Sequence, residues 1–166
     1  NHNSLELSER IGRPLAVAIT LYNLAEIRSD YGEYQEARRL LKESLKVSRR
    51  LGDRVGKIHV FGEMGRIYCR LGAWAQARRL LAAALREAAA SGEALLEANC
   101  RVTAAEALAH LGDYPAGHRE LDRALEYFRC SGHPVEEASA LSRWAWVAWQ
   151  KGEQAPALAM ARAAFR

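Results

Sequence analysis

Apolar residues recur along the chain at a fixed interval of 40 residues. One small-residue series is Ala25, Gly65, Ala105 and Ala145, and a second is Ala37, Ala77, Gly117 and Ala157. Large apolar residues recur at Leu41, Leu81 and Leu121, and at Leu45, Leu85, Leu125 and Phe165. Two glycine series have the same period: Gly12, Gly52, Gly92 and Gly132, and Gly32, Gly72, Gly112 and Gly152. Self-similarity at such a period is typical of a repeat array.

Each period predicts two helices separated by glycine turns. In the first period we expect helices from Pro14 to Tyr31 and from Glu33 to about Arg50. Glycine suits the position after a helix because it adopts a left-handed conformation without a Cβ penalty. Asp53 and Asp113 each follow a glycine, and we expect them to cap the next helix. Because the connections are short, each helix should lie antiparallel to its neighbour.

The small residues are expected where the two helices of a pair approach closely, so that added bulk there would overpack the core. Good helix formers dominate the composition, and no alternating strand pattern opposes them. The predicted fold class is therefore all-α, a right-handed α-solenoid of antiparallel helix pairs.

The repeat boundaries follow from the glycines. Residues 4–12 align with residues 44–52, so residues 1–11 are predicted to be the end of a preceding repeat. The repeats that follow are 12–51, 52–91, 92–131 and a truncated 132–166. Solenoids need polar caps at their ends, and none is visible in the sequence. We therefore expect a single array that is a fragment of a longer one.

Composition and charge exclude several classes of protein. Pro and Gly together make up 16 of 166 residues and 49% of the chain is hydrophobic, which excludes collagen-like and disordered chains. No apolar run of about 18 residues indicates a membrane span, and no signal peptide is visible. The three cysteines have neither disulfide-framework nor zinc-site spacing. Reduced thiols and a cytoplasmic location are expected.

The sequence contains no recognisable catalytic motif. There is no GxSxG, no HExxH among the five histidines and no GxxxxGK[ST] loop. No set of acid, base and nucleophile converges in the pattern. We therefore predict that the chain is not an enzyme, and we expect no catalytic residue, no cofactor and no metal site.

The periodic residues resemble the tetratricopeptide repeat (TPR) family. Its pattern of Trp, Leu-Gly and Tyr, followed by Ala and Phe, is matched best in the second repeat. The matching residues there are Phe61, Met64-Gly65, Tyr68, Gly72-Ala73-Trp74, Ala77 and Leu81. Two departures are the missing terminal Pro and the period of 40 residues instead of 34, which lengthens the helices.

A narrower resemblance covers residues 37–56. This stretch is similar to the long TPR repeats of bacterial signal-transduction ATPases and of the MalT-like and AfsR-like transcriptional regulators. In those proteins the array is a sensor or docking arm for a nucleotide-binding core. The resemblance implies such an arm here, with any ATPase domain outside these residues and with other domains of the same chain as partners.

The TPR resemblance implies a concave groove lined by the first helix of each repeat. The groove positions chosen on this basis as binding residues are Tyr22, Asn23, Glu26, Asp30, Arg66, Arg70, Glu106, His110, Arg143, Trp146 and Trp149. Their chemistry varies between repeats, which favours one irregular protein or peptide partner. Tyr22 and Glu26 stand where the chaperone-binding clamp has Lys and Asn, so that clamp is excluded.

The tryptophans of the fourth repeat divide into two groups. Trp144 occupies a packing position of the family and is predicted to be core. Trp146 and Trp149 are three residues apart and share a helix face, beside Arg143. Exposed tryptophans beside arginine are typical of binding hot spots. The alternative, left open, is that both rings pack against a further repeat.

Basic residues recur on the second helices, which could form a stripe. Its members are Arg38, Arg39, Arg78, Arg79 and Arg119. Such a stripe can follow phosphates or an acidic partner, and the chain carries a net charge of +4. However, acidic residues stand near these arginines at helical spacing, and no aromatic residues are interleaved for base stacking. Nucleic acid is therefore a disfavoured partner, and no membrane partner is expected.

The function predicted from these observations is a protein- or peptide-binding scaffold, the sensor or docking arm of a larger bacterial signalling or transcription-regulating ATPase. Two alternatives stay open. One is a stand-alone assembly adaptor, and the other is a receptor arm for a small molecule or signalling peptide.

Overall fold

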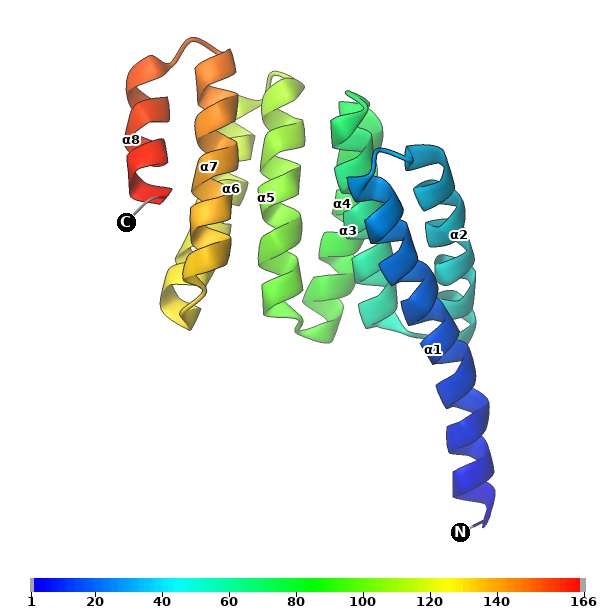
Figure 1. Ribbon diagram of the computed structural model, residues 1–166. Coiled ribbons are helices and arrows are strands. Elements are labelled where there is room, and N and C mark those ends of the chain that lie inside the picture. Colours follow the sequence, from blue (N-terminus) through cyan, green and yellow to red (C-terminus); the bar gives the residue numbers. More distant parts are fainter. Residues whose placement is uncertain (1, 165–166) are drawn as a thin grey trace.

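The computed structural model describes the backbone of residues 2–164 and the side chains of residues 13–164, and this part of the chain contains helices and turns without a strand. The helices are α1 (His2–Asp30), α2 (Tyr34–Leu51), α3 (Arg54–Arg70), α4 (Trp74–Ser91), α5 (Ala94–His110), α6 (Tyr114–Ser131), α7 (Pro134–Gln150) and α8 (Gln154–Ala164). They form four antiparallel pairs stacked in chain order (Figure 1). The all-α solenoid predicted from the sequence is confirmed.

The turns follow the glycine series. All seven glycines of the two series from Gly32 onward have positive φ, between +67° and +90°. This left-handed conformation ends one helix and redirects the chain within three residues, which side chains with a Cβ tolerate poorly. Both predicted caps are present, because the carboxylate of Asp53 accepts from the Gly56 N–H and that of Asp113 accepts from the Ala116 N–H.

The turn expected at Gly12 is absent. Residues 2–30 form one continuous helix that runs through Gly12 and contains Pro14, and its N-terminal part projects beyond α2 (Figure 1). Arg13 offers no acceptor for the amides of a new helix start, whereas Asp53 at the equivalent position does. A side-chain cap is not required for the turn, because Gly92 and Gly132 form it before Glu93 and His133, which make no such cap. Residues 1–11 were predicted to be the end of a preceding repeat, and Phe165 was predicted to continue the series Leu45, Leu85 and Leu125. The side chains on which these two predictions depend lie outside the described residues.

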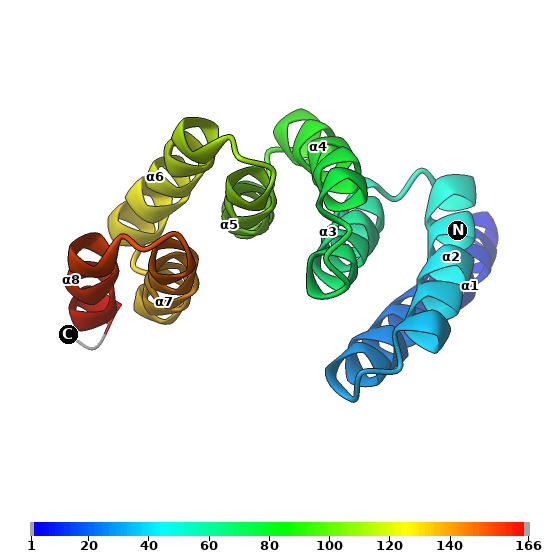
Figure 2. The same cartoon turned by 90° about the horizontal axis from the view of Figure 1, so that it is seen from above.

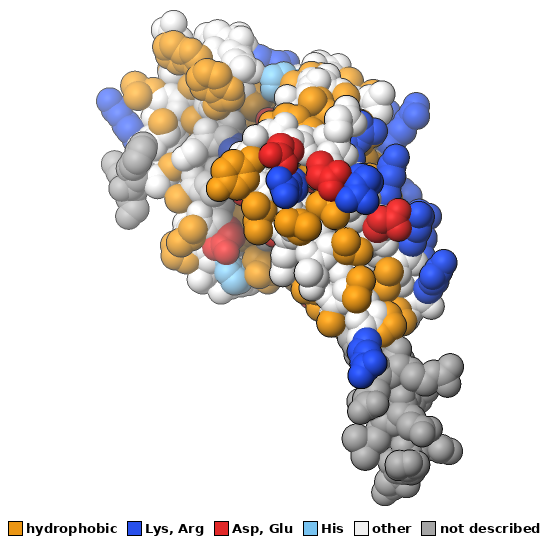
Figure 3. Space-filling model, turned by 45° about the vertical axis from the view of Figure 1, so that its right-hand side comes forward, with side chains coloured by type: hydrophobic (Ala, Val, Ile, Leu, Met, Phe, Trp, Pro, Cys, Tyr) orange, Lys and Arg blue, Asp and Glu red, His pale blue; other side chains and the backbone are white. Residues whose placement is uncertain are grey.

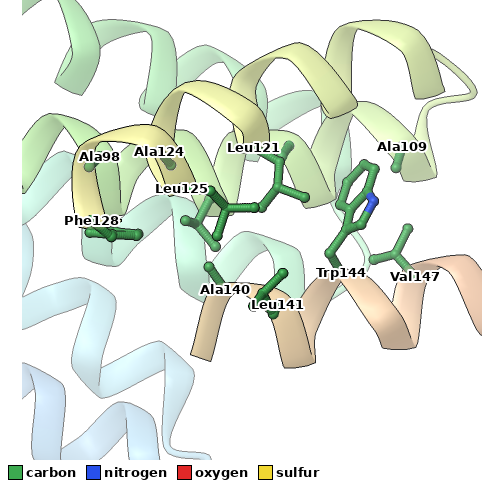
Figure 4. Close-up of a cluster of buried hydrophobic side chains, with 12 residues drawn as sticks. Ala98, Ala109, Leu121, Ala124, Leu125, Phe128, Ala140, Leu141, Trp144 and Val147 are labelled. Carbon is green, nitrogen blue, oxygen red and sulfur yellow. The ribbon is translucent and has the colours of Figure 1, made fainter. Parts of the chain in front are cut away.

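The core lies between the helices of each pair and between one pair and the next. Figure 4 shows one such cluster, in which Leu121, Leu125 and Phe128 of α6 meet Trp144 and neighbouring residues of α7. The small-residue series is buried where it was expected. Gly117 is the tightest point, since an added Cβ would lie 2.8 Å from the Ala105 carbonyl oxygen and 3.0 Å from the Trp144 ring.

The pairs form an arc with two rows of helices. Consecutive first helices contact one another directly, from α1 to α3, from α3 to α5 and from α5 to α7. Within the described residues, α2 does not reach α4, and α4 does not reach α6. The first helices therefore form an inner row and the second helices an outer row, as the view from above shows (Figure 2). None of the described helices is long and apolar enough to cross a membrane.

Candidate functional site

The inner row encloses a hollow of about 460 Å³, and all four first helices contribute to it. Its lining residues are Tyr22, Glu26, Ile58, His59, Gly62, Glu63, Arg66, Leu96, Asn99, Cys100, Val102, Thr103, Val135, Glu136, Ser139, Ala140 and Arg143. We call this surface the charged hollow. Four of the predicted binding residues line it, one or two from each of α1, α3 and α7: Tyr22, Glu26, Arg66 and Arg143.

Tyr22 forms one wall of the charged hollow. Its ring lies 5.2 Å from the imidazole of His59, with the two planes tilted by 58°. Burial raises the pKa of the Tyr22 phenol, and the neighbouring carboxylate of Glu26 raises it further. The phenol therefore remains neutral at physiological pH and serves as a hydrogen-bonding group, not as a base.

Glu63 is the most buried charged residue of the charged hollow. Its side chain is 3% exposed, and its Oε2 atom lies 2.6 Å from Arg66 Nη2. Burial raises the pKa of Glu63, and the neighbouring Arg66 opposes this shift. Arg66 also lies 3.6 Å from Glu26 Oε1, so one guanidinium serves carboxylates from two helices.

Arg70 and Arg143 of the inner row also reach back to the preceding repeat. Arg70 donates to the Ser29 carbonyl at 3.1 Å and lies 3.5 Å from Asp30 Oδ1. Arg143 pairs with Glu106 and lies 3.4 Å from the Thr103 hydroxyl. Asp30, Arg70 and Glu106 therefore lie on the inner row as predicted but outside the charged hollow, and each belongs to a pair between repeats.

His110 lies outside the charged hollow. Its ring stacks on Trp74 at 3.9 Å with an interplanar angle of 7°. It is the last residue of α5, where this helix meets the start of α4, and it lines a separate hollow of about 250 Å³ together with Val147 and Gln150 of α7.

The three tryptophans of α7 divide as the sequence predicted. Trp144 is 2% exposed and belongs to the core, whereas Trp146 and Trp149 are 61% and 57% exposed. The residues one, two and three periods before Trp149 are Ala109, Cys69 and Ser29, and all three are buried. The residues one, two and three periods before Trp146 are Glu106, Arg66 and Glu26, which take part in the ion pairs between repeats. Trp146 thus occupies a groove position, and Trp149 a position that the following first helix covers elsewhere.

A second hollow adjoins the first and was missed by the sequence analysis. It measures about 400 Å³ and lies between α1 and the start of α3. Its lining residues are Leu15, Ala18, Ile19, Tyr22, Asn23, Ser44, Ser48, Asp53, Val55, Gly56 and His59. We call it the apolar hollow. Asn23, a predicted binding residue, lies in this hollow. The sequence signal for the hollow is Gly56, a glycine three residues after the capping Asp53.

The basic stripe lies on the outer row and is partly neutralised. Arg39 forms two hydrogen bonds with the Glu36 carboxylate, at 2.9 and 2.7 Å. The Arg38 guanidinium lies 4.9 Å from the centre of the Tyr68 ring. Arg78, Arg79 and Arg119 are exposed. Figure 3 shows basic side chains gathered along one edge of the molecule.

The thiols and acidic groups do not form a reactive or metal-binding set. Burial raises the pKa of Cys69 to about 12 and that of Cys100 to about 11, so both are protonated at physiological pH. Cys130 is exposed, and all three cysteines are free. Within residues 13–164, no three His, Cys, Asp or Glu side chains are arranged to hold a metal ion.

Comparison with known proteins supports the repeat architecture. The family model of the tetratricopeptide repeat matches residues 16–86, which run from α1 into α4. The crystal structure of BtubC (BKLC) from P. vanneervenii is similar over 98% of this chain and 67% of its own, with a TM-score of 0.77 and 19% sequence identity. At 19% sequence identity, this similarity shows that the two chains share a fold. No curated protein matches the chain. The first two helix pairs thus match the tetratricopeptide repeat family, and the remaining pairs continue the same fold.

Proposed function

We propose that the chain is a protein- or peptide-binding scaffold that receives a segment of its partner on the inner row of helices. The observation that carries this proposal is the charged hollow, to which four consecutive first helices contribute. A site assembled from four repeats is longer than a compact small molecule needs. It provides side chains along the length of an extended or helical segment.

The polar groups of the charged hollow support recognition and not catalysis. Its two arginines are held by carboxylates, and Tyr22 is neutral. Asn99 and Ser139 are exposed on its surface and can exchange hydrogen bonds with a peptide backbone. Tetratricopeptide repeats commonly mediate interactions between proteins, which supports the same conclusion for residues 16–86.

We further propose that this scaffold is the sensor or docking arm of a larger bacterial cytoplasmic regulator. The support is the resemblance of residues 37–56 to the arms of signal-transduction ATPases. Binding on the inner row would change the curvature of the array and so act on a nucleotide-binding domain. A Walker A loop elsewhere in the same polypeptide, with ATPase activity that responds to the bound partner, is the expected finding. A polypeptide with repeats alone would favour the adaptor alternative.

The groove proposal is tested with a display library of random dodecapeptides. We compare the wild-type chain with Asn99→Arg/Ser139→Arg, which places two bulky cations in the charged hollow. The matched control, Gln76→Arg/Ala82→Arg, adds the same charge to exposed positions of α4. Circular dichroism verifies that all three are equally helical.

We expect peptides recovered by the wild-type chain to bind the control within about twofold and the groove variant at least about tenfold more weakly, a loss of about 1.4 kcal/mol. Recovery of no peptide, or equal losses in both variants, would contradict binding on the inner row.

A further inference from the structure

We propose that the inner row selects a peptide segment in which a bulky apolar side chain stands within a few residues of a lysine or arginine. The inference rests on the proposed function and gives its ligand a chemical class. The apolar side chain would enter the apolar hollow, and the basic one the charged hollow.

The walls of the apolar hollow are hydrophobic and accessible. Leu15, Ala18 and Ile19 of α1 face Val55 of α3, and the Ile19 and Val55 side chains are 52% and 38% exposed. At about 400 Å³, the hollow has the size of sites that bind small apolar groups. Covering this surface with an apolar side chain would remove it from water, which favours binding.

The polar groups that Ser44, Ser48 and Asp53 contribute to the apolar hollow are already engaged. The Ser44 hydroxyl donates to the Ala18 carbonyl at 2.8 Å, and the Ser48 hydroxyl donates to Asp53 Oδ2 at 3.3 Å. The other oxygen of Asp53 accepts from the Gly56 N–H at 2.9 Å. These groups therefore need no polar ligand group as a partner, and an apolar side chain in the hollow leaves their hydrogen bonds intact.

Gly56 lines the apolar hollow beside the cap of α3. One period later the equivalent residue is Leu96, which packs against the core beneath α4 and α5. A Cβ at position 56 would overlap the Asp53 carboxylate and would lie 2.5 Å from the Ser48 hydroxyl oxygen. The cap of α3 thus occupies the place that a side chain at position 56 would need, and Gly56 lines the hollow with its backbone alone.

The charged hollow carries an excess of carboxylates in a chain whose net charge is +4. Three carboxylates line it, those of Glu26, Glu63 and Glu136, against the two guanidinium groups of Arg66 and Arg143. Both arginines already have close partners, Glu63 for Arg66 and Glu106 outside the hollow for Arg143.

Two of these carboxylates are weakly paired. Glu26 lies 3.6 Å from Arg66, and Glu136 lies 3.9 Å from His133. Their side chains are 39% and 36% exposed, so a ligand can reach them. Charge complementarity therefore favours a cationic side chain from the ligand.

The two hollows are parts of one surface. Tyr22 and His59 line both of them, and their rings form the wall between the two spaces. A single short segment can therefore place neighbouring side chains on the two sides of this wall. This adjacency is what links the apolar and the basic residue in one recognition sequence.

The test uses the peptides recovered from the dodecapeptide library and three variants. Ile19→Ser removes apolar surface from the apolar hollow, and Val17→Ser is its matched control, because Val17 is also 52% exposed on α1 but lines neither hollow. Glu26→Gln/Glu136→Gln removes the two weakly paired charges. Dissociation constants are measured by fluorescence polarisation at low and high salt.

We expect the peptides to be enriched in Leu, Ile, Met or Phe close to Lys or Arg. Ile19→Ser should weaken binding about tenfold and Val17→Ser less than about twofold. The double Gln variant should weaken binding and flatten its salt dependence. Peptides that are lost on the groove variant but lack the basic residue, or equal effects of Ile19→Ser and Val17→Ser, would overturn this inference alone. Recovery of no groove-dependent peptide would overturn the proposed function as well.

Discussion

Three glycines inside helices differ in what surrounds them. An added Cβ at Gly117 would meet the Ala105 backbone, which cannot move without shifting α5. At Gly65 it would meet the Leu81 side chain at 2.7 Å, and at Gly62 only Cys100 Sγ, at 3.3 Å. Close helix approach is therefore enforced most strictly between α5 and α6.

This difference predicts opposite signs for two alanine substitutions. Gly117→Ala should lower the free energy of unfolding by about 1–3 kcal/mol through overpacking. Gly62→Ala should leave it unchanged or raise it by up to about 1 kcal/mol, because alanine favours the helix. Urea denaturation of both variants measures the effect. Equal stability of the two would contradict the close approach at Gly117.

The buried carboxyl of Glu63 makes stability depend on pH. Its pKa in the folded state is raised above the usual 4.5, first by burial, so the folded state holds this proton more tightly than the unfolded state. The free energy of unfolding therefore falls as the pH rises from about 4.5 through the raised pKa. Glu63→Gln lacks this titration.

We expect the stability of Glu63→Gln relative to the wild type to increase between pH 4 and pH 7. Chemical denaturation at both pH values measures it. Glu36→Gln on the outer row is the control with the opposite sign, because the hydrogen bond from Arg39 lowers the pKa of Glu36. A difference between Glu63→Gln and the wild type that does not change with pH would contradict the prediction.

At the scale of the helix, the helix starts are not equivalent. Asp53 caps α3 with its side chain and Asp113 caps α6, whereas Glu93 at the start of α5 makes no side-chain cap. Asp53 also accepts from the Ser48 hydroxyl, which ties the end of α2 to the start of α3.

Removal of these caps should therefore have graded effects. Asp53→Ala and Asp113→Ala should each lower the free energy of unfolding by about 1 kcal/mol, and Asp53→Ala by the larger amount. Glu93→Ala should have almost no effect. Thermal and urea unfolding of the three variants measures the order. A cost for Glu93→Ala as large as that for Asp53→Ala would contradict it.

The helices were predictable because their boundaries depend on local chemistry. Gly32 and Gly52 adopt positive φ, and Asp53 follows as a cap, and both are features that a sequence displays directly. The continuity of α1 through Gly12 was not predictable from the glycine series, because Gly12 has the same place in the period as Gly52, Gly92 and Gly132, which do form turns. The apolar hollow was missed because it depends on how residues of α1, α2 and the start of α3 come together in space, which the periodic pattern does not show.

At the scale of the whole molecule, charge differs between the two rows. Arg66, Arg70 and Arg143 of the inner row are held in pairs between repeats. Arg78, Arg79 and Arg119 of the outer row are exposed. The two surfaces are therefore expected to bind different classes of ligand. The outer row can attract polyanions through unscreened charge, and the inner row selects by shape and paired charges.

The separation of the two surfaces predicts that they can be altered independently. Arg78→Glu/Arg79→Glu/Arg119→Glu should weaken retention on a cation-exchange column and leave peptide affinity within about twofold, since the substituted side chains lie on α4 and α6. Retention on the column and the dissociation constants of the library peptides, measured by fluorescence polarisation, provide the test. Loss of peptide binding in this variant would place the peptide site on the outer row.

The reach of Arg66 and Arg70 into the preceding repeat limits how the array can be rebuilt. Arg66 lies 40 residues after Glu26 and Arg70 lies 40 residues after Asp30, so a cut at Gly52 separates both pairs. Exchanging whole repeats between such proteins would leave one half of each pair behind. Because the partners are a full period apart, no module of one repeat length contains both, wherever it begins. Modules for engineering should therefore span at least two consecutive repeats, so that the complementary charges are inherited together.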